Sequence, residues 1–144
     1  MLPRRPNGSK GWVLRDALGP YHVVRTQLRI NRTTLRATLY DRGRGVWSSR
    51  VGIGRPGMET PKGHFYIRER LTGFGSTYGP VAFGTSATSD TLTDWPGGGY
   101  VGVHGTNEPG LIPGRPSHGC IRMPNAEVLR LRRLMPVGTP LTIS

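Results

Sequence analysis

The 144-residue sequence predicts a mainly β fold, an antiparallel β-sandwich or a partly closed barrel, with one short helix near residues 125–134. Short apolar segments alternate with polar ones along the chain, and 22 glycines and 13 prolines separate them at turns. Only one stretch repeats its apolar residues at helical spacing. The length suits a single core, and no apolar run approaches the roughly 18 residues of a membrane-spanning helix.

Most of the expected strands lie in the first half of the chain. Residues 21–30 have strand-like apolar content, and residues 33–40 alternate apolar and polar side chains. A glycine-rich turn at 41–45 leads back into a strand over 46–53, which indicates a hairpin. The glycine-, serine- and threonine-rich residues 71–98 are expected to form a long loop. Further short strands are predicted at residues 12–14, 64–68, 100–104 and 139–143.

The predicted helix has recognisable ends. Asn125 is a residue type that favours the N-cap position, and Glu127 suits the first turn, where the helix dipole attracts an acidic group. Pro136 and Gly138 end the helix. Its apolar face consists of Val128, Leu131, Leu134 and Met135.

The charge is unevenly distributed. The net charge is +12, and 15 of the 20 basic residues but only 4 of the 8 acidic ones lie in residues 1–75. Such a surface attracts polyanions, so nucleic acid, anionic lipid and an anionic cell-wall polymer are candidate partners. No apolar signal-peptide segment follows residues 1–5, so the chain is either cytosolic or an excised part of a longer exported protein. Residues 1–19 are expected to be a turn-rich lead-in to a folded domain of residues 20–144.

The strongest chemical signal surrounds the single cysteine, Cys120. A free thiol has a pKa of about 8.5, so it needs a base to act as a nucleophile near neutral pH. His118 lies two residues before the thiol, and His104 ends a predicted strand, so either imidazole can be that base. Gly105 and Gly119 leave room for a substrate backbone to approach. The pattern indicates covalent catalysis.

Two other interpretations remain open at this point. A lone cysteine is often a small buried hydrophobe. His104, His118 and Cys120 are also three potential zinc ligands, with Glu108 as the only carboxylate in that region. A closed structural zinc site needs a fourth ligand, whereas an open catalytic zinc site would need a general base such as Glu108. Thiol catalysis is preferred to both.

The segments Val-His-Gly-Thr at 103–106 and Ser-His-Gly-Cys-Ile-Arg at 117–122 together resemble the signature of the bacterial L,D-transpeptidase catalytic domain, also called the YkuD domain. The resemblance covers approximately residues 21–144, whereas residues 1–19 resemble the tail of a preceding wall-binding module. Arg122 stands where the family often has asparagine. Supporting similarity lies at residues 51–54, 60–65, 78–80 and 138–143.

The resemblance implies a mechanism on peptidoglycan stem peptides. Cys120 attacks a stem carbonyl, the terminal D-alanine leaves, and an amine of a second stem takes the acyl group from the resulting thioester. His104 is implied as the base, the Gly105 carbonyl as the group that orients it, and His118 as a secondary imidazole. The backbone N–H groups of Gly119 and Cys120 are implied as oxyanion donors. No metal or organic cofactor is then needed, and carbapenems are expected to acylate the thiol.

Substrate contacts are expected from four side chains. Arg122 can bind a substrate carboxylate, although an ordinary surface arginine is an equal alternative. Ser117 either holds the turn or touches substrate. Tyr78 and Trp95 are expected to wall the cleft, unless they are simply core aromatics.

Two rival functions and a location complete the expectations. A carboxypeptidase would use water in place of the acceptor amine, and a basic polyanion-binding module would leave Cys120 inert. Stem peptides, and beyond them anionic wall polymers, are the expected partners, in preference to nucleic acid, with the protein acting as a monomer. That chemistry places the protein outside the cytoplasm, in the cell wall or periplasm, with the export signal taken to lie upstream.

Overall fold

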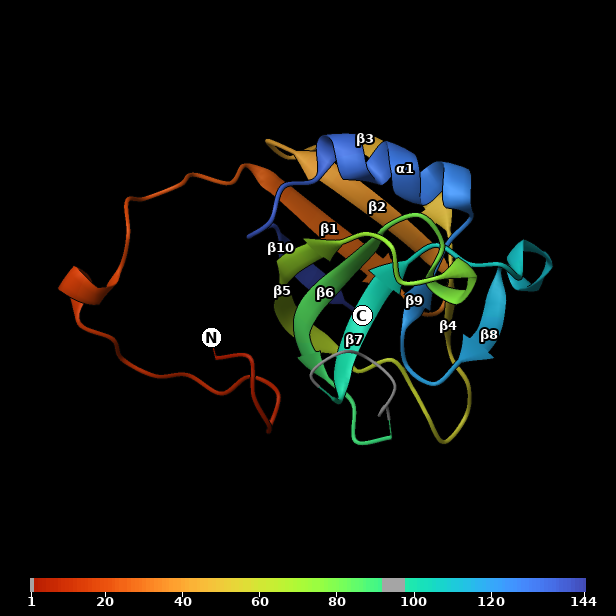
Figure 1. The fold of residues 1–144 in the computed structure, drawn as a ribbon, viewed down its shortest axis with the longest axis horizontal. Coiled ribbons are helices and arrows are strands. Elements are labelled where there is room, and N and C mark those ends of the chain that lie inside the picture. Colours follow the sequence, from red (N-terminus) through yellow and green to blue (C-terminus); the bar gives the residue numbers. More distant parts are fainter. Residues whose placement is uncertain (1, 92–97) are drawn as a thin grey trace.

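Ten strands form one curled sheet in the computed structural model, which describes residues 2–91 and 98–144 (Figure 1). The strand order across the sheet is β3-β2-β1-β10-β5-β6-β7-β9-β4-β8. The first five strands in the chain are β1 (Thr26–Asn31), β2 (Arg36–Asp41), β3 (Arg44–Arg50), β4 (Gly52–Gly54) and β5 (Gly63–Leu71). The others are β6 (Ala82–Thr88), β7 (Tyr100–His104), β8 (Gly114–Ser117), β9 (Ile121–Arg122) and β10 (Pro140–Ile143).

The expected mainly β fold, a partly closed barrel with one short helix, is confirmed, and its strand pairing is mixed. Among the described residues six neighbouring strand pairs are antiparallel and three are parallel. The parallel pairs are β1 with β10, β7 with β9, and β4 with β8. Each parallel pair joins strands that are distant in sequence, because a tight turn can connect only antiparallel strands.

Several predicted elements match the structure, and some do not. The helix α1 (Asn125–Leu134) and strand β7 lie where they were predicted. Residues 12–14 form no strand and are exposed. Strand β6 lies inside the segment that was expected to be a loop, and all seven of its residues are buried. A strand buried on both faces shows no polar–apolar alternation, which explains why its pattern was missed.

The core lies between the curled sheet and α1. Val128 and Leu131 of α1 pack into the same buried cluster as the inward-facing side chains of β1 and β2. The Trp47 indole N–H of β3 donates to Glu127 Oε2 of α1 (2.9 Å), which ties the helix to the sheet. No helix within the described ranges is long and apolar enough to cross a membrane.

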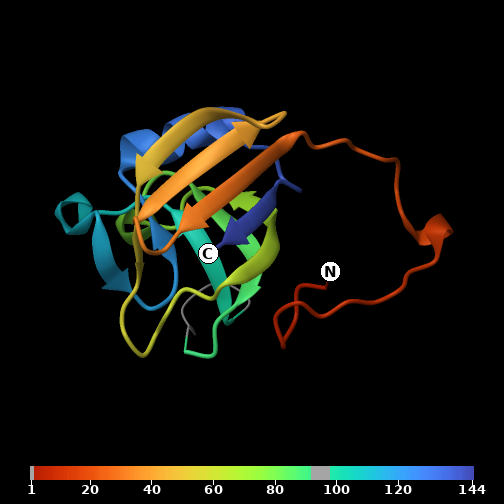
Figure 2. The same ribbon diagram turned by 180° about the vertical axis from the view of Figure 1, so that it is seen from behind.

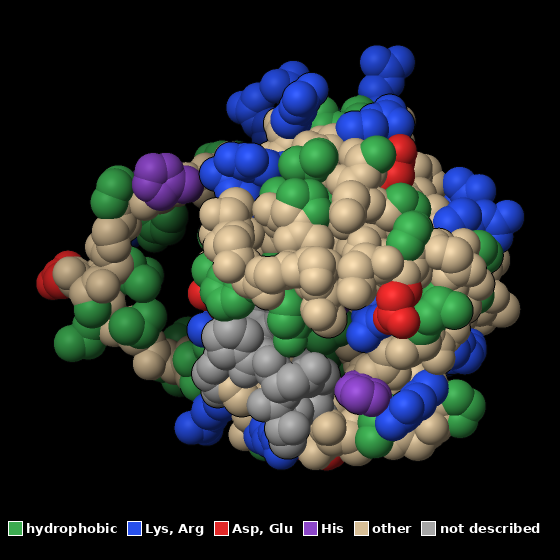
Figure 3. All heavy atoms as spheres, turned by 45° about the vertical axis from the view of Figure 1, so that its right-hand side comes forward, with side chains coloured by type: hydrophobic (Ala, Val, Ile, Leu, Met, Phe, Trp, Pro, Cys, Tyr) green, Lys and Arg blue, Asp and Glu red, His purple; other side chains and the backbone are tan. Residues whose placement is uncertain are grey.

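The segment before β1 begins against the sheet, arches away from it, and returns to enter β1 (Figures 1 and 2). Residues 11–23 of this arm are exposed and include the short 3₁₀ turn η1 (Arg15–Ala17). Figure 3 shows open space between the arm and the body, and it shows Lys and Arg side chains far outnumbering Asp and Glu on that face. The arm is therefore held at its two ends.

Candidate active site

The two sequence motifs meet because β7 and β9 pair in parallel. Val103 pairs with Ile121, and His104 pairs with Arg122, so the residues just before β9 lie beside the end of β7. The 3₁₀ turn η2 (Ser76–Tyr78) contributes the aromatic side of the same site. A small pocket results, lined by Thr77, Tyr78, His104, Ser117, His118, Cys120 and Arg122.

Cys120 is largely buried, with 6% of its surface exposed, and that surface faces the pocket. The Gly102 backbone N–H of β7 donates to its Sγ atom (3.3 Å). A hydrogen bond to sulfur favours the anionic thiolate, which is the nucleophilic form. The sulfur is thus both reachable from the pocket and supported by a donor.

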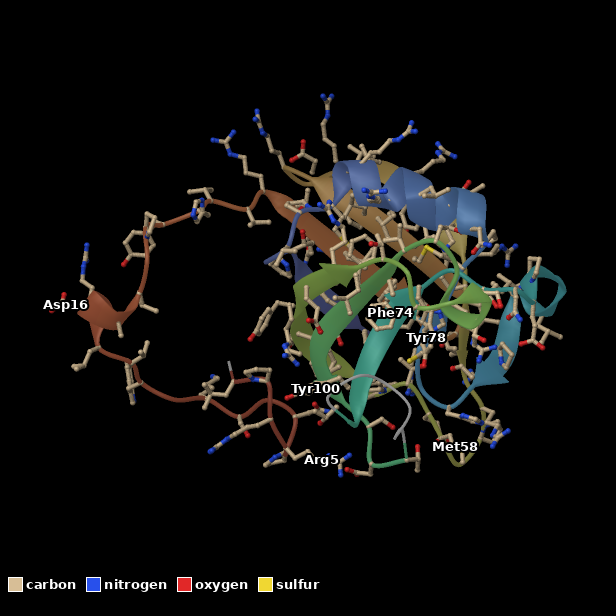
Figure 4. The ribbon with its side chains drawn as sticks, in the orientation of Figure 1. Arg5, Asp16, Met58, Phe74, Tyr78 and Tyr100 are labelled. Carbon is tan, nitrogen blue, oxygen red and sulfur yellow. The ribbon has the colours of Figure 1, made fainter. Side chains whose placement is uncertain are left out.

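His104 is buried at the end of β7, and the backbone of the next residue sets its ring orientation. Its Nδ1 atom lies 2.6 Å from the carbonyl oxygen of Gly105. A carbonyl oxygen only accepts hydrogen bonds, so Nδ1 carries the proton and the neutral ring keeps Nε2 as a proton acceptor. The Tyr78 ring packs against the imidazole at 4.9 Å between centroids, and Phe74 meets Tyr78 edge-on at 6.4 Å (Figure 4).

Asn125 supports the His104 turn and does not cap its own helix. The residue before the helix is Pro124, and no side-chain cap bond is formed there. Asn125 Oδ1 accepts the Thr106 N–H (2.9 Å) instead. A Cβ atom at Gly105 would lie 2.2 Å from this oxygen, and one at Gly79 would lie 2.3 Å from it. The N-cap prediction for Asn125 is therefore wrong, because its amide is used by the neighbouring turn.

The turn that carries Cys120 is braced by hydroxyl groups. Ser117 Oγ donates to the Cys120 carbonyl (2.6 Å) and accepts the Gly119 N–H (3.2 Å). Gly119 has φ +129°, a conformation that L side chains rarely adopt. Ser117 therefore holds the turn, and the Gly119 N–H already has a partner here.

Thr60, outside both motifs, fixes the other side of this turn. Its Oγ1 donates to the Gly119 carbonyl (2.8 Å) and accepts the Gly54 N–H (2.9 Å). Just before it, the Gly57 N–H donates to Glu59 Oε1 (3.0 Å), and this bond lowers the pKa of the exposed Glu59 carboxyl. No chemical pattern singled out Thr60, although it lies in the supporting segment 60–65.

The remaining predicted residues differ in their exposure and their contacts. His118 is exposed at the pocket, and its ring makes no hydrogen bond within the described part of the chain. Arg122 Nη1 pairs with Glu108 Oε2 (3.0 Å), and the Arg122 Nε atom is buried without a described partner. Trp95 lies outside the described residues. Within residues 2–91 and 98–144, His104, His118 and Cys120 do not gather into a metal-binding group.

Comparison with known proteins gives consistent results. The family model for the L,D-transpeptidase catalytic domain, YkuD, matches residues 25–143. The Bacillus licheniformis protein YkuD, which is named for this family, is 34% identical over 125 residues, which cover 87% of this chain and 66% of that protein. The chain thus spans about 66% of the length of this curated relative.

Solved structures share the fold. An Enterococcus faecium L,D-transpeptidase, solved as a cysteine-to-serine mutant, matches with a TM-score of 0.66 at 21% identity, covering 85% of this chain and 50% of that one. L,D-transpeptidase 3 from Mycobacterium tuberculosis, in complex with a faropenem-derived adduct, matches with a TM-score of 0.64 at 15% identity, covering 83% and 60%. Because the family match spans nearly the whole sheet and both sequence motifs, the chain belongs to the YkuD family of L,D-transpeptidase catalytic domains.

Proposed function

We propose that this protein is a cysteine-dependent L,D-transpeptidase that cross-links peptidoglycan stem peptides through a thioester on Cys120. The observation that carries the proposal is the shared pocket of Cys120 and His104, in which the Gly105 carbonyl orients the imidazole (2.6 Å). This arrangement supplies a nucleophile, a base and an orienting group, which are the three parts of a nucleophilic catalytic triad.

In the acylation half-reaction, His104 Nε2 takes the proton of the Cys120 thiol as the sulfur attacks the carbonyl of the third stem residue. The tetrahedral oxyanion is stabilised by the Cys120 N–H and by the Gly119 N–H, which exchanges Ser117 Oγ for the substrate oxygen. One such donor contributes about a hundred- to a thousandfold in rate. The intermediate collapses as the C–N bond breaks, and His104 returns the proton to the departing D-alanine amine.

In the second half-reaction, the side-chain amine of a diamino acid in another stem attacks the thioester. His104 takes a proton from this amine, the C–S bond breaks, and the thiolate recovers the proton. The product joins the third residues of two stems. Water in place of the amine would give a carboxypeptidase, which shares the entire first half-reaction.

Three side chains are assigned to substrate. Arg122 binds a stem carboxylate, because it lines the pocket and its guanidinium can pair with a carboxylate. His118, exposed at the pocket, contacts the incoming peptide. Tyr78 forms one wall of the cleft. This substrate implies an extracytoplasmic location, in the cell wall or periplasm.

Anionic wall polymers are proposed as a second partner, bound by the exposed face of β1–β3. Arg36 and Arg50 are register partners on β2 and β3, and Arg29 lies diagonally from Arg36 on β1. Like charges directly opposite each other are destabilising, and a bound anion removes that repulsion. Replacing these three arginines by glutamine should weaken co-sedimentation with polyphosphate far more than the matched change at Arg130, Arg132 and Arg133 of α1. Equal losses would show a non-specific charge effect.

The transpeptidase proposal is tested with purified disaccharide-tetrapeptides. Mass spectrometry of the products should detect dimers joined through third residues with the wild-type protein and none with Cys120→Ala. Trimmed monomers alone would assign the carboxypeptidase reaction. Unchanged substrate with the wild-type protein would contradict both enzymatic functions.

A further inference from the structure

The first residues of the chain bind the sheet at β6 and β7, far from β1, where the chain enters the sheet. Tyr100 Oη, at the start of β7, donates to the Pro3 carbonyl (2.6 Å). Arg5 Nη2 donates to the Ser89 carbonyl (2.6 Å), and Figure 4 shows Arg5 and Tyr100 at the same end of the sheet. We call residues 3–7 the amino-terminal clasp. They precede the family match, which begins at residue 25.

Asn7 is the most completely bonded member of the clasp. Its Nδ2 donates to the Thr88 carbonyl (2.7 Å), while its Oδ1 accepts the Thr88 N–H (2.8 Å) and the Thr88 hydroxyl (2.9 Å). The amide therefore satisfies both backbone groups of Thr88, as a neighbouring strand would. Thr88 is only 7% exposed, so water is a poor substitute for these bonds.

The clasped segment touches the turn that carries the nucleophile. Ser89 follows Thr88, is 6% exposed, and donates its N–H to the Gly99 carbonyl (2.7 Å). A Cβ atom built on Gly119 would lie 3.3 Å from Ser89 Oγ and 3.6 Å from Ser89 Cβ. Ser89 thus packs against the residue directly before Cys120. The Arg5–Asp90 ion pair (3.4 Å) is largely exposed and adds little.

We propose that the amino-terminal clasp is a positioning element for the active site. Asn7 and Arg5 fix Thr88 and Ser89, Ser89 holds Gly119 in place, and Gly119 sets the position of the Cys120 sulfur and N–H. Asn7 is a positioning residue and touches no reacting atom. The catalytic part of this inference rests on the proposed transpeptidase function.

The test compares Asn7→Ala with Arg4→Ala. Arg4 is exposed and close in sequence, and its side chain makes none of the contacts above. Two rates are measured: acylation by a carbapenem, and alkylation of the single cysteine by iodoacetamide across pH. Asn7→Ala should slow acylation roughly tenfold with little change in the concentration for half-maximal rate, because small displacements of a nucleophile cost rate more than binding. Arg4→Ala should match the wild-type protein.

A double-mutant cycle tests the route through Ser89. Asn7→Ala and Ser89→Ala together should slow the reaction less than the product of their separate effects, because they act on one chain of contacts. Asn7→Asp, which keeps both acceptor bonds to Thr88 and loses the donor, should be intermediate. If Asn7→Ala fails to fold, Arg5→Ala replaces it in the same comparison.

The two possible failures are distinguishable. If Asn7→Ala reacts with both reagents as fast as the wild-type protein, whatever its melting temperature, the clasp inference is overturned and the enzyme proposal is unaffected. A wild-type protein that is alkylated by iodoacetamide but never acylated would overturn the enzyme proposal. In that case the alkylation rates and their pH profiles alone decide whether the clasp positions Cys120.

Discussion

The Oδ1 atom of Asn125, in the first residue of α1, accepts the backbone N–H of Thr106 and thereby links the helix to the turn after His104. Thr106 is 1% exposed, so water is a poor substitute for this acceptor. The helix start and the histidine turn are consequently one structural unit.

Replacing Asn125 by alanine should destabilise the protein by about 1–3 kcal/mol, the cost of leaving a buried donor unsatisfied. Asn125→Asp keeps the oxygen and should retain most of the stability. Urea unfolding curves measure both differences. Equal losses for the two variants would contradict the assigned role of Oδ1.

Gly105 should not tolerate a methyl group. A Cβ atom there would lie 2.2 Å from Asn125 Oδ1 and 3.1 Å from the Gly79 Cα atom, so Gly105→Ala should cost about 1–3 kcal/mol through overpacking. Gly110 is a matched control, since a Cβ there meets nothing within 4 Å. Thermal unfolding should separate the two variants by several degrees, and a Gly110→Ala loss as large as that of Gly105→Ala would refute the packing argument.

Thr60→Val should weaken the Cys120 turn without changing side-chain volume. The Thr60 hydroxyl bonds both the Gly119 carbonyl and the Gly54 N–H, and Thr60 is 1% exposed. We expect a loss of about 1–3 kcal/mol together with slower acylation, whereas Thr60→Ser should stay near wild type. Acylation at wild-type rate in a folded Thr60→Val protein would remove Thr60 from the site.

Arg122 and Glu108 should have opposite effects on substrate binding. Their ion pair is half-exposed on the Glu108 side, at 52%, so breaking it should change stability by no more than about 1 kcal/mol. Arg122→Gln should raise KM for a tetrapeptide donor with a smaller change in kcat, because it removes the proposed carboxylate partner. Glu108→Gln releases the guanidinium and should lower KM or leave it unchanged. A raised KM in both variants would show that the Arg122–Glu108 ion pair only stabilises the local structure.

The strands and motifs that were correctly predicted have local signals. Strand β7 and helix α1 show their own periodicity, and the residues around Cys120 combine a thiol with nearby imidazoles and glycines. The parallel pairing of β7 with β9 has no such signal, because choice of a strand partner depends on the whole chain. The sequence therefore indicated both halves of the site without showing how they meet.

Other features were wrongly assigned or missed, because their local sequence pattern does not show their role. An asparagine at a helix start looks the same whether it caps the helix or bonds a neighbouring turn, so Asn125 was ambiguous. Thr60 and Asn7 act through side-chain hydrogen bonds to residues that are distant in sequence, which leave no periodic pattern. Strand β6 was hidden because burial on both faces removes alternation.

The most direct measurement is the intact mass of the protein after incubation with a carbapenem. The wild-type protein should gain the mass of one drug molecule, or of its acyl fragment, and Cys120→Ala should gain none. His104→Ala should form the adduct about a hundred- to ten-thousandfold more slowly, as expected for loss of a general base. An adduct of equal yield on Cys120→Ala, or wild-type kinetics in His104→Ala, would contradict the account of a thiol nucleophile served by a buried imidazole.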